Sequence, residues 1–329
     1  MKILMDKFLK TLEGSLPDVQ HVKLRTEPDC YGMSRIVSKG LGLFFNPYSF
    51  ANWYHGWLSW NVKHVETFGL ISPYKYLVAT RYQESFLKDQ GIDAIAVGAP
   101  FVYAGEIDTV TIQRQKNSLL VMPPHVTTDA KKGWDEESYV KQILDLEGEF
   151  DYIVACVSSS CVQKKHWISQ FKKYGIPYIV GADMSDKNAL IRMSNIFKNF
   201  EYVTTNRIGS HVAYAAYSGC KVSIFGDYLP LLKEEFENDE LYNQYPFLIN
   251  NVMNEASKES VYSKFPFLFV HPKKASKNVQ WAVEQLGGNN KKSFFVLAKH
   301  LGWLPHQQAY FWSRRVLLKL KKEISLFLC

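Results

Sequence analysis

The chain has 329 residues, about twice the length of a typical single domain, so we expect two packed units. Apolar residues make up 47% and charged residues 22%, a composition that excludes an intrinsically disordered chain. Aromatic residues reach 15%, and the 39 lysines and arginines exceed the 32 acidic residues, giving a net charge of +7. The positive charge indicates an anionic partner: phosphate, nucleic acid or a membrane surface. The five cysteines show no disulfide or CxxC spacing, which is typical of a reducing, cytoplasmic protein.

The first hundred residues predict a small α/β unit. Asp6 and Lys7 stand where a secretory signal would need its apolar core, so we expect no signal peptide. Apolar runs predict strands over 41–45, 76–80 and 94–98, with a helix over 83–90. An aromatic loop covers 52–57, and the polar segment 104–116 is interpreted as a linker.

From residue 117 onward, short apolar strands alternate with helices. The predicted strands are 118–122, 152–157, 177–180, 202–205 and 221–225, and the predicted helices are 135–147, 166–174, 187–198 and 210–217. This alternation predicts a doubly wound parallel sheet with helices on both faces. We therefore expect an N-terminal α/β domain over 1–104, a linker over 105–116, a Rossmann-like domain over 117–230, and C-terminal helices over 231–329.

The most informative segment is 204–211, which lies between a predicted buried strand and a helix. Gly209 permits close approach of a ligand, Ser210 and His211 add side-chain donors, and the helix start offers free N–H groups. This arrangement predicts a phosphate site at the carboxyl end of a strand. The alternative is a core helix with Ser210 as its N-cap. The chain has neither GxGxxG nor GxxxxGK[ST], which argues against NAD binding and P-loop ATPase chemistry.

Three segments carry a resemblance to a known class of enzyme. The run TTNRIGSHVAYAAYSGCKVSIFG resembles the donor-binding strand, loop and helix of bacterial GT-B glycosyltransferases of capsule and lipopolysaccharide pathways. The run YLVATRYQESFLKDQGIDAIAVGAPFVYA looks like the end of the N-terminal half of such enzymes. The loop Trp53-Tyr54-His55-Gly56 is similar to the histidine–glycine loop of teichoic-acid glycerolphosphotransferases. The resemblance covers about residues 44–227.

The resemblance implies a GT-B-like fold, in which two Rossmann-like domains face a central cleft and C-terminal helices follow. It implies that the second domain binds the nucleotide-sugar and the first binds the acceptor. The implied donor-binding residues at the helix start are Thr205, Asn206, Gly209, Ser210 and His211.

His55 is the predicted general base. A histidine titrates near neutral pH, and in the resembling phosphotransferases this histidine acts on the acceptor hydroxyl. Gly56 would let a substrate come close, and Trp53, Tyr54, Trp57 and Trp60 suit stacking on sugar rings. The alternative is a histidine packed among aromatic residues in a core loop.

Two further donor-site candidates follow predicted strands. His125 could bond the donor phosphate or the sugar, or only shape a turn with Pro124. Asp183 could accept hydrogen bonds from a ribose or base, or cap the next helix. The pair His271-Pro272 resembles a nucleotide-contacting pair of sialyltransferases but stands in the wrong chain order, so we interpret it as a surface turn. No HExxH or clustered Cys/His spacing is present, and we predict metal independence and no cofactor besides the nucleotide-sugar substrate.

The segment 312–329 reads as a basic amphipathic helix, either on an anionic membrane surface or docked on the core. The combined hypothesis is an inverting glycosyltransferase of cell-surface glycans (lipopolysaccharide, O-antigen or capsule). We expect it in the cytoplasm, peripheral on the inner face of the plasma membrane, with a glycan or lipid-linked glycan as acceptor. The alternatives are a CDP-polyol phosphotransferase, a pyruvyl- or sugar-modifying enzyme of the same architecture, and a nucleic-acid-binding protein. The last lacks a basic stripe with interleaved aromatics outside the final helix, so no nucleic acid is expected.

Overall fold

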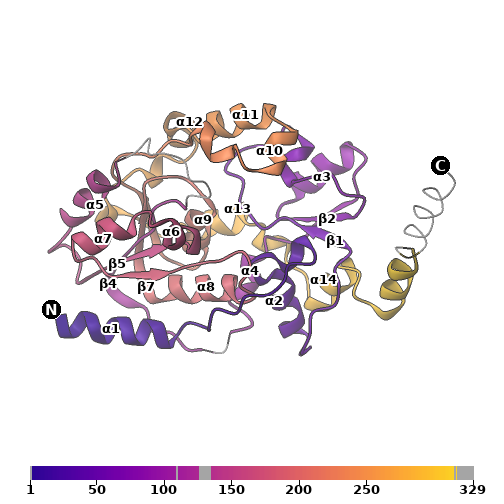
Figure 1. Cartoon of the computed structure of the whole chain (residues 1–329), viewed down its shortest axis with the longest axis horizontal. Coiled ribbons are helices and arrows are strands. Elements are labelled where there is room, and N and C mark those ends of the chain that lie inside the picture. Colours follow the sequence, from indigo (N-terminus) through magenta and orange to yellow (C-terminus); the bar gives the residue numbers. More distant parts are fainter. Residues whose placement is uncertain (1, 109, 126–134, 315, 317–329) are drawn as a thin grey trace.

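The computed structural model describes residues 2–108, 110–125, 135–314 and 316 (Figure 1). It is an α/β protein with two parallel sheets. The smaller sheet has the strand order β1 (Ala51–Trp53), β2 (Lys75–Val78), β3 (Ala94–Ala96). The larger sheet has the order β6 (Tyr178–Val180), β5 (Tyr152–Val157), β4 (Gln115–Val121), β7 (Phe200–Thr205), β8 (Lys221–Ile224).

The larger sheet confirms the predicted doubly wound topology. The chain starts at the central strand β4, runs outward through β5 and β6, and returns to β7 on the other side of β4. The strand order therefore reverses between β4 and β7, which is where sheets of this kind bind ligands. The helices between the strands are α5 (Glu136–Leu144), α6 (Ser159–Lys164), α7 (Ile168–Lys173), α8 (Ala189–Asn199) and α9 (Ser210–Tyr217).

One helix of this unit, α6, was not predicted, and the helix predicted over 166–174 begins later than expected. The segment predicted as a single helix over 166–174 follows a separate short helix, α6, and α7 begins only at Ile168. Lys165 and Trp167 between them have left-handed φ values of 60° and 66°, which a continuous α-helix does not allow.

In the smaller unit the predicted strand over 41–45 is wrong. Helix α2 (Met33–Gly40) ends directly before this segment, and the segment itself begins with a turn. Met33, Ile36 and Val37 recur at helical spacing and are fully buried, so the apolar face that packs belongs to the helix. The residues predicted as the strand instead form a loop in which Phe44 and Phe45 are exposed and Leu41 and Leu43 are partly buried. The other helices of this unit are α3 (Arg81–Asp89), which begins with a capping box between Thr80 and Gln83, and α4 (Phe101–Ala104).

Each sheet is completed by a segment from the opposite end of the chain. Helix α1 (Lys2–Gly14) lies against the larger sheet, where the Phe8 ring is 4.8 Å from Tyr152 and 5.3 Å from Phe200. Helix α13 (Val279–Gln285) packs against α9, and helix α14 (Phe294–His300) packs against α2 of the smaller unit. There the backbone N–H of Ala99 donates to the carbonyl of Leu286 at 2.8 Å.

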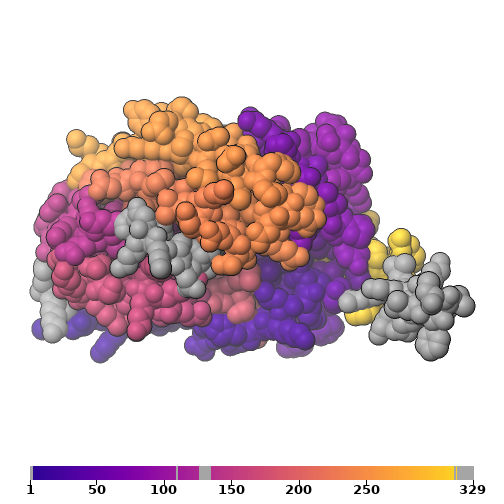
Figure 2. Space-filling view, turned by 45° about the horizontal axis from the view of Figure 1, so that its top comes forward, coloured from indigo at the N-terminus to yellow at the C-terminus, as the bar shows by residue number. Residues whose placement is uncertain are grey.

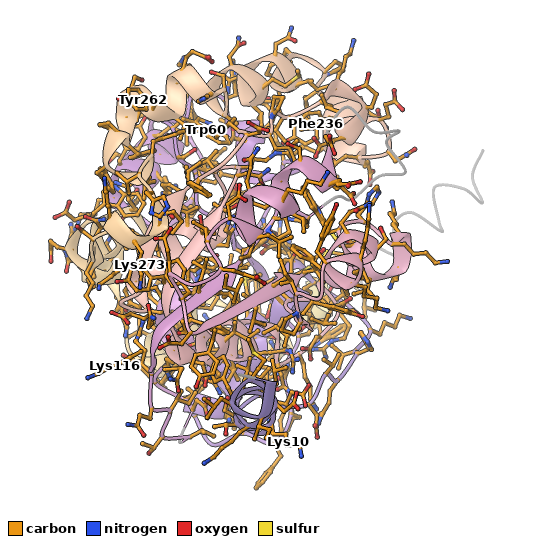
Figure 3. All side chains as sticks on the ribbon, turned by 90° about the vertical axis from the view of Figure 1, so that its left-hand side faces the viewer. Lys10, Trp60, Lys116, Phe236, Tyr262 and Lys273 are labelled. Carbon is orange, nitrogen blue, oxygen red and sulfur yellow. The ribbon has the colours of Figure 1, made fainter. Side chains whose placement is uncertain are left out.

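The remaining helices cover one end of the molecule. These are α10 (Glu240–Gln244), α11 (Phe247–Glu255) and α12 (Lys258–Lys264), and Figure 2 shows this orange segment running over both units. Figure 3 shows Trp60, Phe236 and Tyr262 near this end and Lys10 of α1 at the other. Short 3-10 helices are η1 (Glu27–Gly32), η2 (Val65–Phe68), η3 (Lys233–Phe236), η4 (Pro266–Leu268), η5 (Pro272–Lys274) and η6 (Gly288–Asn290).

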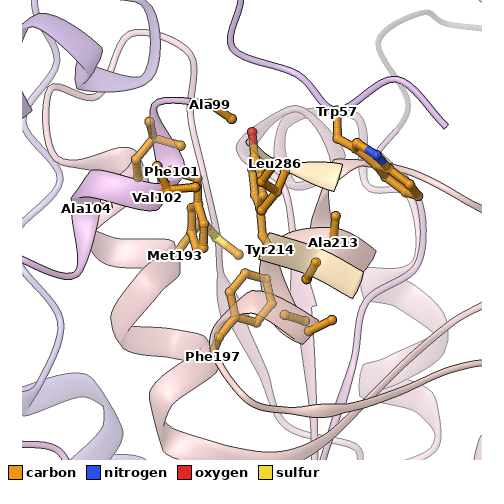
Figure 4. Packing of buried hydrophobic residues seen from close by; sticks show 14 of the residues in the cluster. Trp57, Ala99, Phe101, Val102, Ala104, Met193, Phe197, Ala213, Tyr214 and Leu286 are labelled. Carbon is orange, nitrogen blue, oxygen red and sulfur yellow. The ribbon is translucent and has the colours of Figure 1, made fainter. Parts of the chain in front are cut away.

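A continuous apolar core joins the two units. One cluster of buried residues includes Trp57 and Ala99 of the smaller unit, Tyr214 of α9, and Leu286 (Figure 4). The rings of Phe101 and Tyr214 stack at 4.1 Å with an interplanar angle of 5°. A second cluster lies between β4, β5, α5 and α7. Among the described residues, no helix is long and apolar enough to cross a membrane.

Candidate active site

Two hydrogen bonds join the loop after β1 to the first turns of α9. The backbone N–H of Trp57 donates to Ser210 Oγ at 2.9 Å. The hydroxyl of Tyr214 donates to the carbonyl of His55. The histidine loop predicted in the first unit and the phosphate loop predicted in the second are therefore in direct contact, although about 150 residues separate them in sequence.

His55 is paired with a carboxylate that the sequence did not point to. Its Nδ1 lies 3.5 Å from Glu27 Oε1, and the other oxygen of Glu27 accepts a hydrogen bond from the backbone N–H of Trp53. The His55 ring lies 5.0 Å from Tyr31 and 6.0 Å from Tyr54. A carboxylate on Nδ1 orients the ring and leaves Nε2 as the nitrogen that can take a proton from a hydroxyl.

Tyr31 holds a strained position beside this pair. Its φ is 54°, in the left-handed region, and its backbone N–H donates to the carbonyl of Met184 at 2.8 Å. The next residue, Gly32, has φ 76°, and a Cβ there would come within 1.9 Å of the Lys187 carbonyl oxygen, so only glycine fits. Burial, followed by the charges of Cys30 and Asp183, raises the pKa of Tyr31 to about 12, so the phenol is an uncharged hydrogen-bonding group at neutral pH.

His55 acts on the ionisation of His125 and His125 on that of His211, so the three histidines predicted from the sequence lie within electrostatic range of one another. His125 is exposed to solvent, yet enough protein surrounds it that desolvation is the largest cause of its lowered pKa, and the charges of Arg207 and His55 lower it further. Desolvation, followed by the charges of His125 and Arg207, lowers the pKa of His211 to about 3. Both imidazoles are therefore neutral at pH 7 and able to donate or accept hydrogen bonds.

Two buried polar atoms near the start of α9 have no hydrogen-bond partner among the described residues. They are His211 Nε2 and Asn206 Oδ1, while the amide nitrogen of Asn206 donates to the carbonyl of Asp227 at 3.1 Å. An unpaired buried polar atom costs free energy, so a ligand that pairs it is favoured. Gly209 is extended, and a Cβ on it would come within 3.0 Å of the His211 ring. The glycine therefore makes room for the imidazole.

The loop between β7 and α9 is held by an ion pair that the sequence did not indicate. The Arg207 side chain is 5% exposed and donates to both oxygens of Glu235 at 2.9 Å. It also donates to the carbonyl of Leu229 at 2.9 Å. Arg207 thus fixes the loop before α9, where it stands two residues before Gly209 in the sequence.

Two of the predicted sugar-stacking residues are corrected by the structure. The Trp53 side chain is fully buried and donates to the carbonyl of Gly98 at 3.1 Å. Trp57 is 7% exposed and packs between Phe265 and Trp281. Both indoles belong to the core and are not available for a sugar ring; Trp57 serves the site through its backbone.

The other residues of this loop are less enclosed. Tyr54 is partly exposed and packs edge-on against Phe68 at 5.3 Å, and burial raises its pKa. Trp60 is also partly exposed, and its buried indole nitrogen has no partner within the described part of the chain. A Cβ on Gly56 would make only ordinary contact with the Tyr54 ring, at 3.4 Å. Tyr54 and Gly56 remain candidates for acceptor contact.

The remaining donor-site candidates have local partners. Thr205 is buried, and its hydroxyl donates to the carbonyl of Arg207 at 3.2 Å. The Asp183 carboxylate accepts hydrogen bonds from Ser159 and from the backbone and hydroxyl of Ser185. Burial alone would raise its pKa, but these hydrogen bonds outweigh that effect and lower it. Asp183 does not cap the next helix, because the N-cap of α8 is Asn188.

His271 lies apart from this group, with its Nε2 3.5 Å from Glu149 and its ring against Phe225. Within the described residues, no group of three or more His, Cys, Asp and Glu side chains is arranged to hold a metal ion. Metal independence stays a prediction.

Comparisons with known proteins provide little evidence on the function of this chain. No family model and no curated protein matches the chain. Among solved structures, the pneumococcal O-GlcNAc transferase GtfA in complex with UDP and GlcNAc is 12% identical over 66% of this chain and 44% of that one, with a TM-score of 0.25. The chain thus spans less than half the length of that protein. A TM-score this low does not establish a shared fold, so the function proposed below depends on the site itself.

Proposed function

We propose that the chain is a glycosyltransferase that transfers a sugar from a nucleotide-sugar to a growing cell-surface glycan. The observation that carries this proposal is the pair of hydrogen bonds from Trp57 to Ser210 and from Tyr214 to His55. They place a candidate base beside a helix start at the switch point of a doubly wound sheet. The resemblance of the segments around these residues to GT-B glycosyltransferases supports the same assignment.

The donor phosphates would lie at the start of α9. The free N–H groups and the positive end of the helix dipole favour an anion there. His211 and His125 add uncharged donors, and His211 Nε2 would gain the partner that it lacks. Asp183 lies on the same edge of the sheet, after β6, and is the candidate for the ribose or base. These groups would meet the charge of the leaving nucleotide without a metal ion.

His55 would act on the acceptor. Its Nε2 takes the proton of a sugar hydroxyl while the hydroxyl oxygen attacks the anomeric carbon of the donor. The bond from that carbon to the phosphate oxygen breaks, and the nucleoside diphosphate leaves. A single displacement of this kind inverts the anomeric configuration. Glu27 stabilises the imidazolium that forms.

We further propose that the acceptor is lipopolysaccharide, O-antigen or capsule glycan, reached from the cytoplasmic face of the membrane. The predicted amphipathic helix over 312–329 would bring the enzyme to a lipid-linked acceptor. Residues 315 and 317–329 lie outside the described part of the chain. Trp312, which lies within the described part of the chain, packs against Tyr48, with the ring centroids 5.1 Å apart.

The test is thermal unfolding of the purified chain against a panel of nucleotide-sugars, CDP-polyols and random oligonucleotides. At about 100 times its Kd, a true donor stabilises the protein by about 2.7 kcal/mol, which raises the midpoint by several degrees. Stabilisation by a nucleotide-sugar supports the proposal. A response to CDP-polyols alone favours the phosphotransferase, and salt-sensitive binding of oligonucleotides favours a nucleic-acid-binding protein. If none of the nucleotides stabilised the protein, the proposed donor site would be refuted.

A further inference from the structure

The loop between α2 and β1 exposes two adjacent phenylalanines. Phe44 is 99% exposed and Phe45 is 67% exposed. Burying such a side chain stabilises a fold by roughly 1.5–3 kcal/mol. The described chain lacks this stabilisation at both phenylalanines. Contiguous apolar surface of this kind marks an interaction site.

The loop is held in place rather than loosely extended. Gly42 turns the chain with φ 69°, and the Leu43 N–H donates to the Ser38 carbonyl at 2.8 Å. Asn46 closes the loop from its other end, accepting a hydrogen bond from the Ser38 hydroxyl at 2.6 Å and donating to the Ser34 hydroxyl at 3.0 Å. The backbone therefore presents the two rings at a fixed position.

Other exposed apolar residues lie on the same edge of the smaller sheet. Leu70 and Ile71 precede β2, as Phe44 and Phe45 precede β1, so both loops lie at the amino ends of neighbouring strands. Helical residues 305–314 pack on this edge, with the ring of Phe311 4.6 Å from Phe50 and 6.5 Å from Tyr74. The exposed Tyr310 and Trp312 belong to this segment, which Figure 1 shows at the end of the molecule opposite to α1.

Exposed basic side chains stand on the elements beside this edge, together with the acidic Glu66 and Asp93. Lys39 is exposed in the last turn of α2, and Lys299 and Arg314 are exposed on the neighbouring helical segments. Lys75, Lys299 and Lys292 act together on His300, where desolvation and these charges lower the pKa. The acidic Asp93 is compensated by Lys75, 3.2 Å away.

We propose that this edge, formed by the loops 43–46 and 69–73 and by residues 305–314, is a docking surface for an anionic lipid bilayer. Apolar tips on separate loops suit a fluid interface, into which each can insert on its own, better than a rigid protein groove. The surrounding lysines and arginines supply the second signal that stable membrane binding requires. The surface lies at the amino ends of the strands, whereas the candidate site lies at their carboxyl ends, so docking leaves the site open.

The test is sedimentation of the full chain with phosphatidylcholine vesicles, with and without phosphatidylglycerol. We expect binding that requires phosphatidylglycerol and weakens with salt. The double variant Phe44→Ser/Phe45→Ser should lose at least about tenfold in partitioning, because two rings no longer leave water. The matched control is Tyr262→Ser, an aromatic residue 54% exposed on α12, which should bind as the wild type does.

Equal binding of the double variant and the wild type would overturn the proposal, because another segment would then carry the contact. So would self-association of the wild type that the double variant abolishes, without vesicle binding, since the surface would then meet a second copy. Stabilisation by nucleotides is measured on the same variants and should not change. Failure of the docking surface is therefore distinguishable from failure of the proposed glycosyl transfer.

Discussion

At the scale of single residues, the pairing of Glu27 with His55 gives the sharpest test of the proposed chemistry. His55→Ala should lower turnover by about 10²–10⁴-fold, the usual contribution of a general base, and leave donor binding unchanged. Glu27→Gln should keep the amide oxygen that accepts from Trp53 and lose the charge that supports the imidazolium. Turnover should fall less than in His55→Ala, with KM little changed.

The measurement is steady-state kinetics over pH with the donor found in the nucleotide screen. His64→Ala is the matched control, because His64 packs against Phe247 and has no part in the site. Full turnover by His55→Ala would remove the base assignment, and full turnover by Glu27→Gln would remove the positioning role of Glu27.

His211 makes the folded chain sensitive to acid. The pKa of His211 is about 3 in the folded protein against an ordinary 6.5, because desolvation opposes its charge. Between these values the unfolded chain binds a proton that the folded chain does not, so stability falls as pH falls below 6.5. The loss approaches about 1.4 kcal/mol for each pH unit.

The corresponding variant is His211→Gln, followed by urea unfolding at pH 7 and pH 5. The decrease in stability between the two pH values should be smaller in the variant than in the wild type. His125, whose pKa is also lowered, contributes a slope of the same sign that the variant keeps. An identical pH dependence in the two proteins would contradict the assignment.

At the scale of elements, the first turn of α9 has a double role. Ser210 accepts the N–H of Trp57, and the same hydroxyl can donate to a phosphate. Ser210→Ala should cost about 1–3 kcal/mol of stability by leaving a buried N–H unpaired, and it should weaken donor binding as well. Ser293→Ala, which removes the N-cap of α14, should cost about 1 kcal/mol without changing donor affinity.

Urea unfolding with and without nucleotide separates the two effects. If Ser210→Ala loses stability but binds the nucleotide as Ser293→Ala does, then Ser210 serves only to join the two units.

Sequence alternation predicted the larger sheet well, because each βα unit there is a local pattern of apolar runs and turns. The predicted strand over 41–45 failed for a physical reason: an apolar run does not reveal whether tertiary structure will bury it, and here Phe44 and Phe45 are exposed. The same limit explains Trp53 and Trp57, because an aromatic cluster in sequence fits a core as well as a sugar site.

Residues of the candidate site could likewise be predicted only where a local sequence pattern marks them. His125 and Ser210 could be found because each follows a strand that ends at the ligand-binding edge. Glu27 could not be found, since it reaches His55 from a 3-10 helix 28 residues upstream through packing alone. Asp183 was found as a polar residue after a strand, but its bonds to Ser159 and Ser185 depend on how three separate segments meet.

At the scale of the whole molecule, the two candidate surfaces lie at opposite edges of one small sheet. The strands between them have three or four residues, which at about 3.3 Å per residue separates the edges by roughly 10–13 Å. An acceptor on a docked membrane must therefore extend at least that far from the lipid surface to reach His55. A lipid-linked glycan with several sugars meets this requirement, whereas a bare lipid phosphate does not.

The shared core predicts that the two sheets unfold together. Leu286 is fully buried in the cluster that joins them, and its carbonyl accepts the N–H of Ala99. Leu286→Ala should cost about 2–5 kcal/mol, as for other large-to-small core changes. Ile143→Ala, fully buried in the separate cluster behind the larger sheet, should cost a similar amount.

Hydrogen exchange of peptides from β2 and β5 in increasing urea measures each sheet separately. Because strands β4, β5 and β7 contribute side chains to both clusters, each variant should lower the protection of both peptides by the same free energy. If Ile143→Ala affected β5 and left β2 unchanged, the sheets would be independent domains, and the contact between the His55 loop and α9 would open without unfolding either of them.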